Sequence, residues 1–160
     1  RKPGDLPAPE LKRADGVFRD LRSQGIWPFP QGRAPSAGTD VGMAAVLYVC
    51  TTCRAGQPVP EGAAAPGQQL FSALSDQGAP EGVTIRPVEC LSACDHGCSV
   101  ALSKAGGWSY VYGRMTLADA PEILRGAALY ADADAGIVPW RDRPVIFRKQ
   151  SLARIPPMEP

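Results

Sequence analysis

Residues 44–53 read AAVLYVCTTC, and residues 83–94 read VTIRPVECLSAC. Each stretch is a mostly apolar, β-branched run that ends at a pair of cysteines. The two runs predict buried strands over Ala44–Val49 and Val83–Val88, each followed at once by a cysteine-bearing loop. Between them, apolar residues share one face of a helix over residues 67–77. The sequence therefore predicts a β-α-β unit whose strands are parallel and whose crossover is right-handed.

Two further strands and a helix follow this unit. Ser99–Ser103 and Trp108–Tyr112 are short β-type runs joined by a Gly-containing turn, which predicts a hairpin. Asp119 and Glu122 are spaced as a capping box at the start of a helix whose apolar residues recur at helical spacing. The order β-α-β-β-β-α is that of a thioredoxin-like α/β domain with a mixed sheet.

Composition restricts the function. The 160 residues are enough for one domain, with 44% hydrophobic and 21% charged residues. A net charge of +1 gives no overall field for nucleic acid or an anionic membrane, so neither partner is expected. No apolar run approaches the roughly 20 residues of a membrane span. We therefore expect a cytoplasmic protein.

The predicted domain occupies residues 43–136, and irregular segments flank it. Residues 1–42 are rich in proline and predict an extension that is mobile or docked on the domain. Residues 137–160 form a basic tail in which Trp140 and Phe147 alternate with arginines. This tail predicts docking to an acidic redox partner or to a second copy in a homodimer, and a merely solvated tail is the alternative.

All five cysteines lie between residues 50 and 98. Because the carboxyl ends of parallel strands meet at one edge of a sheet, the two loops should bring their thiols together. These thiols are Cys50 and Cys53 after the first strand, and Cys90 and Cys94 after the second, with Cys98 following.

Converging thiolates indicate a soft metal or redox chemistry. The spacing of Cys50 and Cys53 suits a zinc knuckle. A [2Fe–2S] cluster also takes four cysteines, so the spacing favours neither. A third interpretation is a thiol–disulfide oxidoreductase that uses Cys50 and Cys53, although a loop, not a helix, is expected after Cys53.

The segment VECLSACDHG (residues 88–97) resembles the C-L-G-x-C-x-x-G-P loop of thioredoxin-like [2Fe–2S] ferredoxins. More narrowly, YVCTTCR (residues 48–54), this loop and WRDRP (residues 140–144) resemble a family of small predicted metal-binding proteins of unknown function. The resemblance implies a one-electron carrier, more an electron-transfer protein than an enzyme, and a connection with cobalamin or cobalt metabolism. A zinc- or cobalt-binding module in metal handling is the alternative.

By position, the resemblance makes Cys50, Cys53, Cys90 and Cys94 the cluster ligands. Cys98 stands where the ferredoxin loop has proline, which makes it an alternative ligand or a buried spectator. Amides of the second loop, such as those of Ser92 and Gly97, are candidate donors to cluster sulfur. His96, the only histidine of the chain, is more typical of a solvent-facing loop residue than of a ligand.

Overall fold

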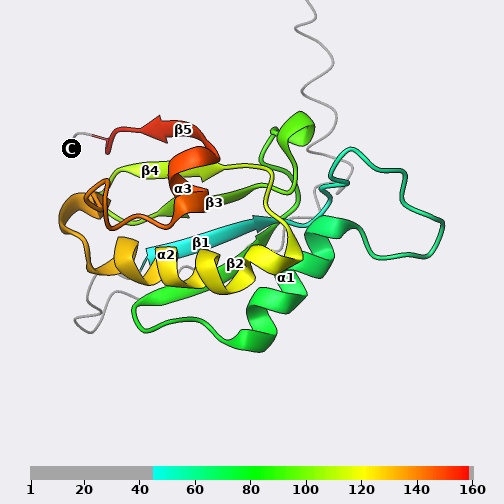
Figure 1. Ribbon diagram of the computed structural model, residues 1–160, viewed down its shortest axis with the longest axis horizontal. Helices are drawn as coiled ribbons and strands as arrows, with labels where there is room; N and C mark the ends of the chain where they lie inside the picture. The colour runs from blue at the N-terminus through cyan, green and yellow to red at the C-terminus, as the bar shows by residue number, and fades with distance from the viewer. Residues whose placement is uncertain (1–44, 159–160) are drawn as a thin grey trace, which may run out of the picture. The chain divides into compact units, whose positions relative to one another are not determined.

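Five strands form one mixed sheet in the order β2-β1-β3-β4-β5 (Figure 1). The structure is a computed structural model that describes residues 45–158, so the predicted extension at residues 1–42 lies outside the described residues. β1 and β2 are parallel, and every other neighbouring pair is antiparallel. The strands are β1 (Ala45–Cys50), β2 (Val83–Val88), β3 (Val100–Ser103), β4 (Ser109–Tyr112) and β5 (Ser151–Ile155).

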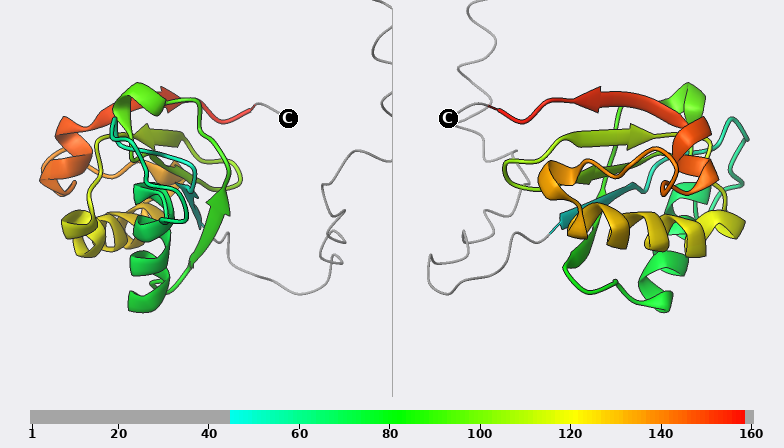
Figure 2. Two further views of the ribbon diagram at one scale, coloured as in Figure 1. Left: turned by 90° about the vertical axis from the view of Figure 1, so that its right-hand side faces the viewer. Right: turned by 60° about the vertical axis from the view of Figure 1, so that its left-hand side comes forward.

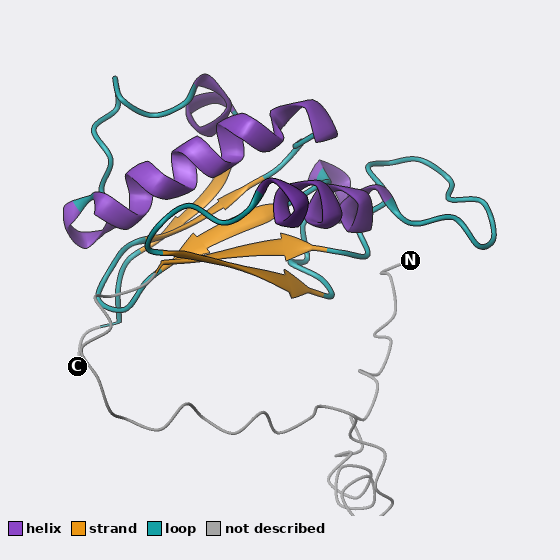
Figure 3. Cartoon of the chain, turned by 90° about the horizontal axis from the view of Figure 1, so that it is seen from below, coloured by secondary structure: helices purple, strands orange, loops and turns teal. Residues whose placement is uncertain are grey.

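The two long helices cover the same face of this sheet (Figure 3). They are α1 (Pro66–Gln77) and α2 (Ala120–Asp132). Alternate strand residues and the apolar helix faces meet in the core, where the most deeply buried side chains are Leu47, Val49, Leu70, Leu74, Val100, Leu102, Ile123 and Tyr130. The observed order β1-α1-β2-β3-β4-α2 confirms the predicted thioredoxin-like arrangement.

The segment after Ile137 is not an irregular tail, as the sequence suggested. It forms a short helix, α3 (Val145–Lys149), and then β5, which pairs antiparallel with β4 (Figure 2). Phe147 of α3 is buried and stacks on Tyr112 of β4, with the ring centroids 4.0 Å apart. The folded domain therefore extends through β5.

The start of α2 also differs in detail from the expectation. The capping box consists of Thr116 and Asp119, one turn earlier than the predicted pair of Asp119 and Glu122. The Asp119 carboxylate accepts hydrogen bonds from the amide and the hydroxyl of Thr116, both at 2.8 Å. A one-turn 3₁₀ segment, η2 (Leu117–Asp119), therefore begins directly after the capping residue Thr116 and continues into α2. In the described part of the chain, no helix combines the length and apolarity needed to cross a membrane.

Candidate functional site

The two cysteine loops leave the sheet at the same edge, because β1 and β2 are parallel and in register. Cys50, the last residue of β1, is paired with Val88, the last residue of β2. Both following loops project from this edge (Figure 1). The structure thus brings together the two cysteine pairs that the sequence placed after separate strands.

Two threonines tie the first cysteine loop to the second. The amides of Thr51 and Thr52 donate to the carbonyls of Val88 and Glu89, at 2.9 and 3.3 Å. Both hydroxyls donate to the same two carbonyls. The Cys50 thiol also donates to the Glu89 carbonyl at 3.6 Å. The residues between Cys50 and Cys53 thus hold the start of the second loop in place.

Cys53 is buried, and two glycines make room for it. The amide of Gly67 in the first turn of α1 donates to the Cys53 carbonyl at 2.9 Å, and a side chain at position 67 would collide with the Cys50 carbonyl. A Cβ atom at Gly97 would overlap the Cys53 sulfur. Glycine at both positions is therefore a steric requirement of the site.

Cys90 and Cys94 form the exposed part of the cluster of thiols. The Ser92 amide donates to the Cys90 sulfur at 3.2 Å, which confirms one of the predicted amide donors. Ser92 has a φ of 54°, in the left-handed region that favours glycine. The other candidate donor, the Gly97 amide, bonds the Cys94 carbonyl instead of a sulfur. Cys94 begins the 3₁₀ segment η1 (Cys94–His96).

Cys98 lies on the inner side of the site. It is 3% exposed, and its carbonyl accepts a hydrogen bond from the Met115 amide at 3.0 Å. Besides burial, the neighbouring Cys53 raises the pKa of its thiol. The peptide bond between Gly97 and Cys98 is cis. Cys98 therefore contacts the buried thiols, while Cys90 and Cys94 face solvent.

Burial and neighbouring groups shift the pKa values of the thiols in different directions. Burial raises the pKa of Cys98 to about 12 and also raises the pKa of Cys50 above its usual value. The Ser92 amide lowers the pKa of Cys90, and the hydrogen bond with Cys90 raises the pKa of its neighbour Cys94. Negative charge is thus best accommodated on Cys90, at the exposed side.

The thiols of the two loops influence one another's pKa. Cys90 and Cys94 shift each other's pKa, Cys50 also acts on the pKa of Cys90, and Cys50 and Cys53 help to raise the pKa of Cys94. Within residues 45–158, no three His, Cys, Asp or Glu side chains are already gathered as a metal site. His96 is half-buried, and no hydrogen bond of its imidazole is found within that range. Both thiols of the second loop therefore lie near thiols of the first loop.

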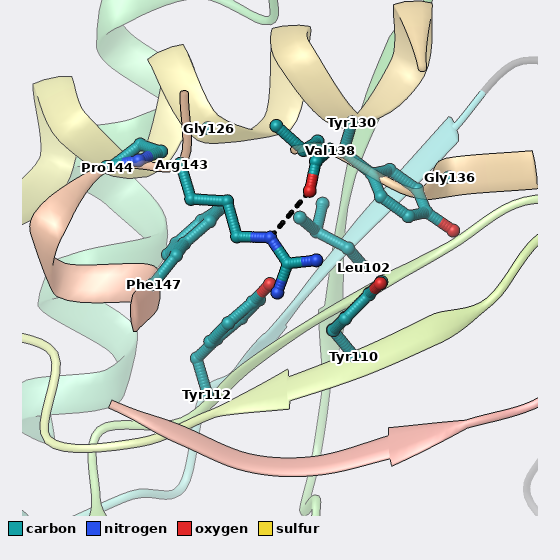
Figure 4. Close-up of a pocket in the computed structure, with 10 residues that line it drawn as sticks. All are labelled: Leu102, Tyr110, Tyr112, Gly126, Tyr130, Gly136, Val138, Arg143, Pro144 and Phe147. Carbon is teal, nitrogen blue, oxygen red and sulfur yellow. Dashed lines mark hydrogen bonds between the residues drawn. The ribbon is translucent and has the colours of Figure 1, made fainter. Parts of the chain in front are cut away.

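A small cavity lies elsewhere, beneath Arg143 on the helical face. Its volume is about 10 Å³, and Tyr110, Tyr112, Tyr130 and Phe147 contribute to its lining (Figure 4). The Arg143 Nε donates to the Val138 carbonyl at 2.7 Å. The buried Tyr110 hydroxyl has no hydrogen-bond partner in the described structure. This volume suffices for about one water molecule, so the cavity is a packing feature and not a substrate site.

Comparison with known proteins identifies the family. A family model described as "Protein of unknown function (DUF1636)" matches residues 47–157. The chain belongs to this family. The match covers both cysteine loops, α3 and β5. No curated protein matches the chain.

Among solved structures, the chain is similar to a thioredoxin-like [2Fe–2S] ferredoxin from Aquifex aeolicus. The identity is 18%, the match covers 70% of this chain and 93% of the ferredoxin, and the TM-score is 0.45. A second structure of the wild-type ferredoxin from the same organism also has 18% identity, with 69% and 98% coverage and a TM-score of 0.43.

The sequence identified the cysteines but missed the residues that position them. Thr51 and Thr52 lock the loops together, Gly67 and Gly97 leave space for Cys53, and the backbone of Ser92 turns its amide toward Cys90. Gly97 is a visible signal, since it directly precedes Cys98, but Gly67 is separated from Cys53 by a whole loop and gives none. The role of the threonines depends on the register of β1 against β2, which the sequence does not show.

Proposed function

We propose that the protein is an electron carrier that binds a [2Fe–2S] cluster through Cys50, Cys53, Cys90 and Cys94. The observation that supports this most strongly is the meeting of two cysteine loops at the carboxyl edge of parallel strands β1 and β2. Thiolates are the ligands of iron–sulfur clusters, so the donor chemistry fits. When bound, such a cluster accepts and returns one electron.

The division of the thiols between interior and surface suits this role. Cys50 and Cys53 are each 3% exposed, whereas Cys90 and Cys94 are exposed. The buried pair would exclude water from one side of the bound group. The exposed pair would offer the other side to a partner.

The second loop carries the features that adjust the electronic properties of a thiolate site. The Ser92 amide donates to the Cys90 sulfur, and such hydrogen bonds stabilise negative charge and raise reduction potential. The threonine bonds to Val88 and Glu89 hold the two loops together. A held ligand frame limits the rearrangement that accompanies electron transfer.

We propose that the redox partner docks over the exposed loop. Exposed basic side chains stand near it: Arg54 follows Cys53, and the Arg114 amide bonds the His96 carbonyl. α3 also ends here, since the carbonyl of Gln150 after Lys149 accepts from the amide of Gly113. Acidic surface on the partner would complement these cations. Cobalamin metabolism, which the sequence resemblance suggests, is the first context in which to seek it.

Serine variants test the ligand set. Metal-free wild-type protein, reconstituted anaerobically with iron and sulfide, should gain visible absorption with about two irons and two sulfides per chain. Cys94→Ser should lose most of this, because it removes one of the four proposed ligands. The matched control, Cys98→Ser, should load like the wild type.

Circular dichroism of each variant separates a lost ligand from a lost fold. Loading by Cys53→Ser together with failure of a folded Cys98→Ser would show that Cys98 is the ligand. A wild-type protein that binds one zinc and never iron and sulfide would overturn the proposal in favour of a metal-handling module.

A further inference from the structure

Cys90 and Cys94 are the two cysteines of the described chain that solvent reaches. Cys50, Cys53 and Cys98 are each only 3% exposed, and all five are free thiols. Each of the two exposed thiols is among the causes that shift the pKa of the other, so they lie near each other on the loop. The chain thus contains an exposed pair of neighbouring thiols that is chemically distinct from the buried ones.

The exposed Cys90 sulfur accepts a hydrogen bond from the nearby backbone. The Ser92 amide approaches its sulfur at 3.2 Å, and Ser92 and Cys90 are both exposed. Cys94 lies at the first position of η1, whose His96 amide bonds the Ala93 carbonyl at 2.9 Å. The loop after β2 therefore carries one sulfur that accepts a hydrogen bond from an amide and a second exposed sulfur four residues later.

We propose that, in the metal-free protein, Cys90 and Cys94 form a reversible disulfide with low-molecular-weight disulfides such as glutathione disulfide. This disulfide blocks loading of the cluster until a thiol reductant reopens it. The block on cluster loading rests on the proposed function, whereas formation of the disulfide does not. The sequence had placed a dithiol at Cys50 and Cys53, but the burial of both favours the other loop.

The exchange is balanced in two steps. The Cys90 thiolate attacks one sulfur of glutathione disulfide, forms a Cys90–glutathione mixed disulfide and releases one glutathione thiolate. Cys94 then gives up its proton and attacks the Cys90 sulfur, which closes the Cys90–Cys94 disulfide and expels the second glutathione. The protein dithiol loses two electrons, and glutathione disulfide is reduced to two glutathione molecules.

Burial keeps the remaining thiols out of this reaction. An attacking thiolate and its target disulfide must approach in line, and a sulfur covered by protein cannot meet a tripeptide disulfide. Cys53 and Cys98 contact each other beneath the surface, where Gly97 lets the Cys53 sulfur sit. The pair should therefore stay reduced while the folded protein is exposed to glutathione disulfide.

The test treats metal-free full-length protein with glutathione disulfide, then alkylates it in denaturant and maps each cysteine by mass spectrometry. The wild type should retain three of its five thiols, with Cys90 and Cys94 joined. Cys94→Ser should instead hold glutathione on Cys90. Cys98→Ser is the matched control, and its Cys90–Cys94 disulfide should form as in the wild type.

A disulfide that maps to the buried cysteines, or glutathione that stays on Cys90 of the wild type, would overturn the proposal. Oxidised protein should take up iron and sulfide only after treatment with dithiothreitol, and equal uptake without it would contradict the block. If reduced protein also fails to load, the cluster assignment is wrong, while the disulfide map still decides the thiol chemistry.

Discussion

At the scale of single residues, Gly97 has the most direct influence on the cysteine site. It lies between η1 and Cys98, and its missing side chain is the space that the Cys53 sulfur occupies. The neighbouring chain is already held by the Gly97 amide, which bonds the Cys94 carbonyl at 3.3 Å. Even one added methyl group therefore cannot be accommodated without moving Cys53.

We expect Gly97→Ala to expose Cys53 while the domain stays folded. Overpacking of a filled site costs about 1–3 kcal/mol, so the Cys53 thiol should react with an alkylating reagent about 5- to 150-fold faster. Mass spectrometry of the labelled protein measures this rate for each cysteine.

Gly62→Ala provides the comparison. Gly62 has a φ of 79°, and a Cβ atom there meets no atom within 4 Å, so this variant adds backbone strain without touching a cysteine. If Cys53 of Gly97→Ala were labelled at the wild-type rate, the site would have room for a side chain at position 97, which contradicts the structure.

The sequence predicts where a cysteine lies when its position follows directly from the order of the strands. Parallel strands end at one edge, so the convergence of Cys50 with Cys90 could be predicted before any coordinates. The burial of Cys53 could not, because it depends on Gly67 and Gly97 packing around it. The left-handed Ser92 could not either, because serine does not itself indicate such a backbone.

At the scale of elements, α3 and β5 are what the sequence did not predict. α3 has five residues, too few for a helical period to stand out, and it is held by Phe147 rather than by its own propensity. β5 is a largely exposed edge strand, so it lacks the buried alternation that marks β1. Its register also shifts beside Val111 and Tyr112. Tertiary pairing with β4, not local pattern, determines this element.

Phe147→Ala should destabilise the domain by about 3–5 kcal/mol, because it removes a buried ring that packs on Tyr112 and against Gly126 of α2. Urea denaturation measures the change. The control is Val145→Ala in the same helix: Val145 is 49% exposed, so this change should alter the free energy of unfolding by less than about 1 kcal/mol. Equal losses in the two variants would contradict the docking of α3.

At the scale of the whole molecule, buried tyrosines make the free energy of unfolding depend on pH in the alkaline range. The Tyr130 hydroxyl of α2 donates to the Trp108 carbonyl at 2.7 Å, and burial raises the pKa of Tyr130 to about 12. Burial also raises the pKa of Tyr112. The folded state therefore holds these phenolic protons more tightly than the unfolded state, whose tyrosines have a pKa of about 10.

Because the folded pKa is the higher one, this stabilisation is complete below about pH 10 and is lost as pH rises toward about 12. Each such group contributes a slope of up to about 1.4 kcal/mol per pH unit in that window. Tyr130→Phe, which has no proton to lose, should show a shallower fall in the free energy of unfolding. Parallel pH profiles for the two proteins would contradict this coupling.

The metal and sulfide content of the protein, purified without oxygen and recorded with its visible spectrum, tests the central proposal most directly. The account predicts a red-brown protein with about two irons and two acid-labile sulfides per chain, whose absorption bleaches on one-electron reduction. A colourless protein that contains about one zinc per chain and does not take up iron and sulfide on reconstitution would contradict it.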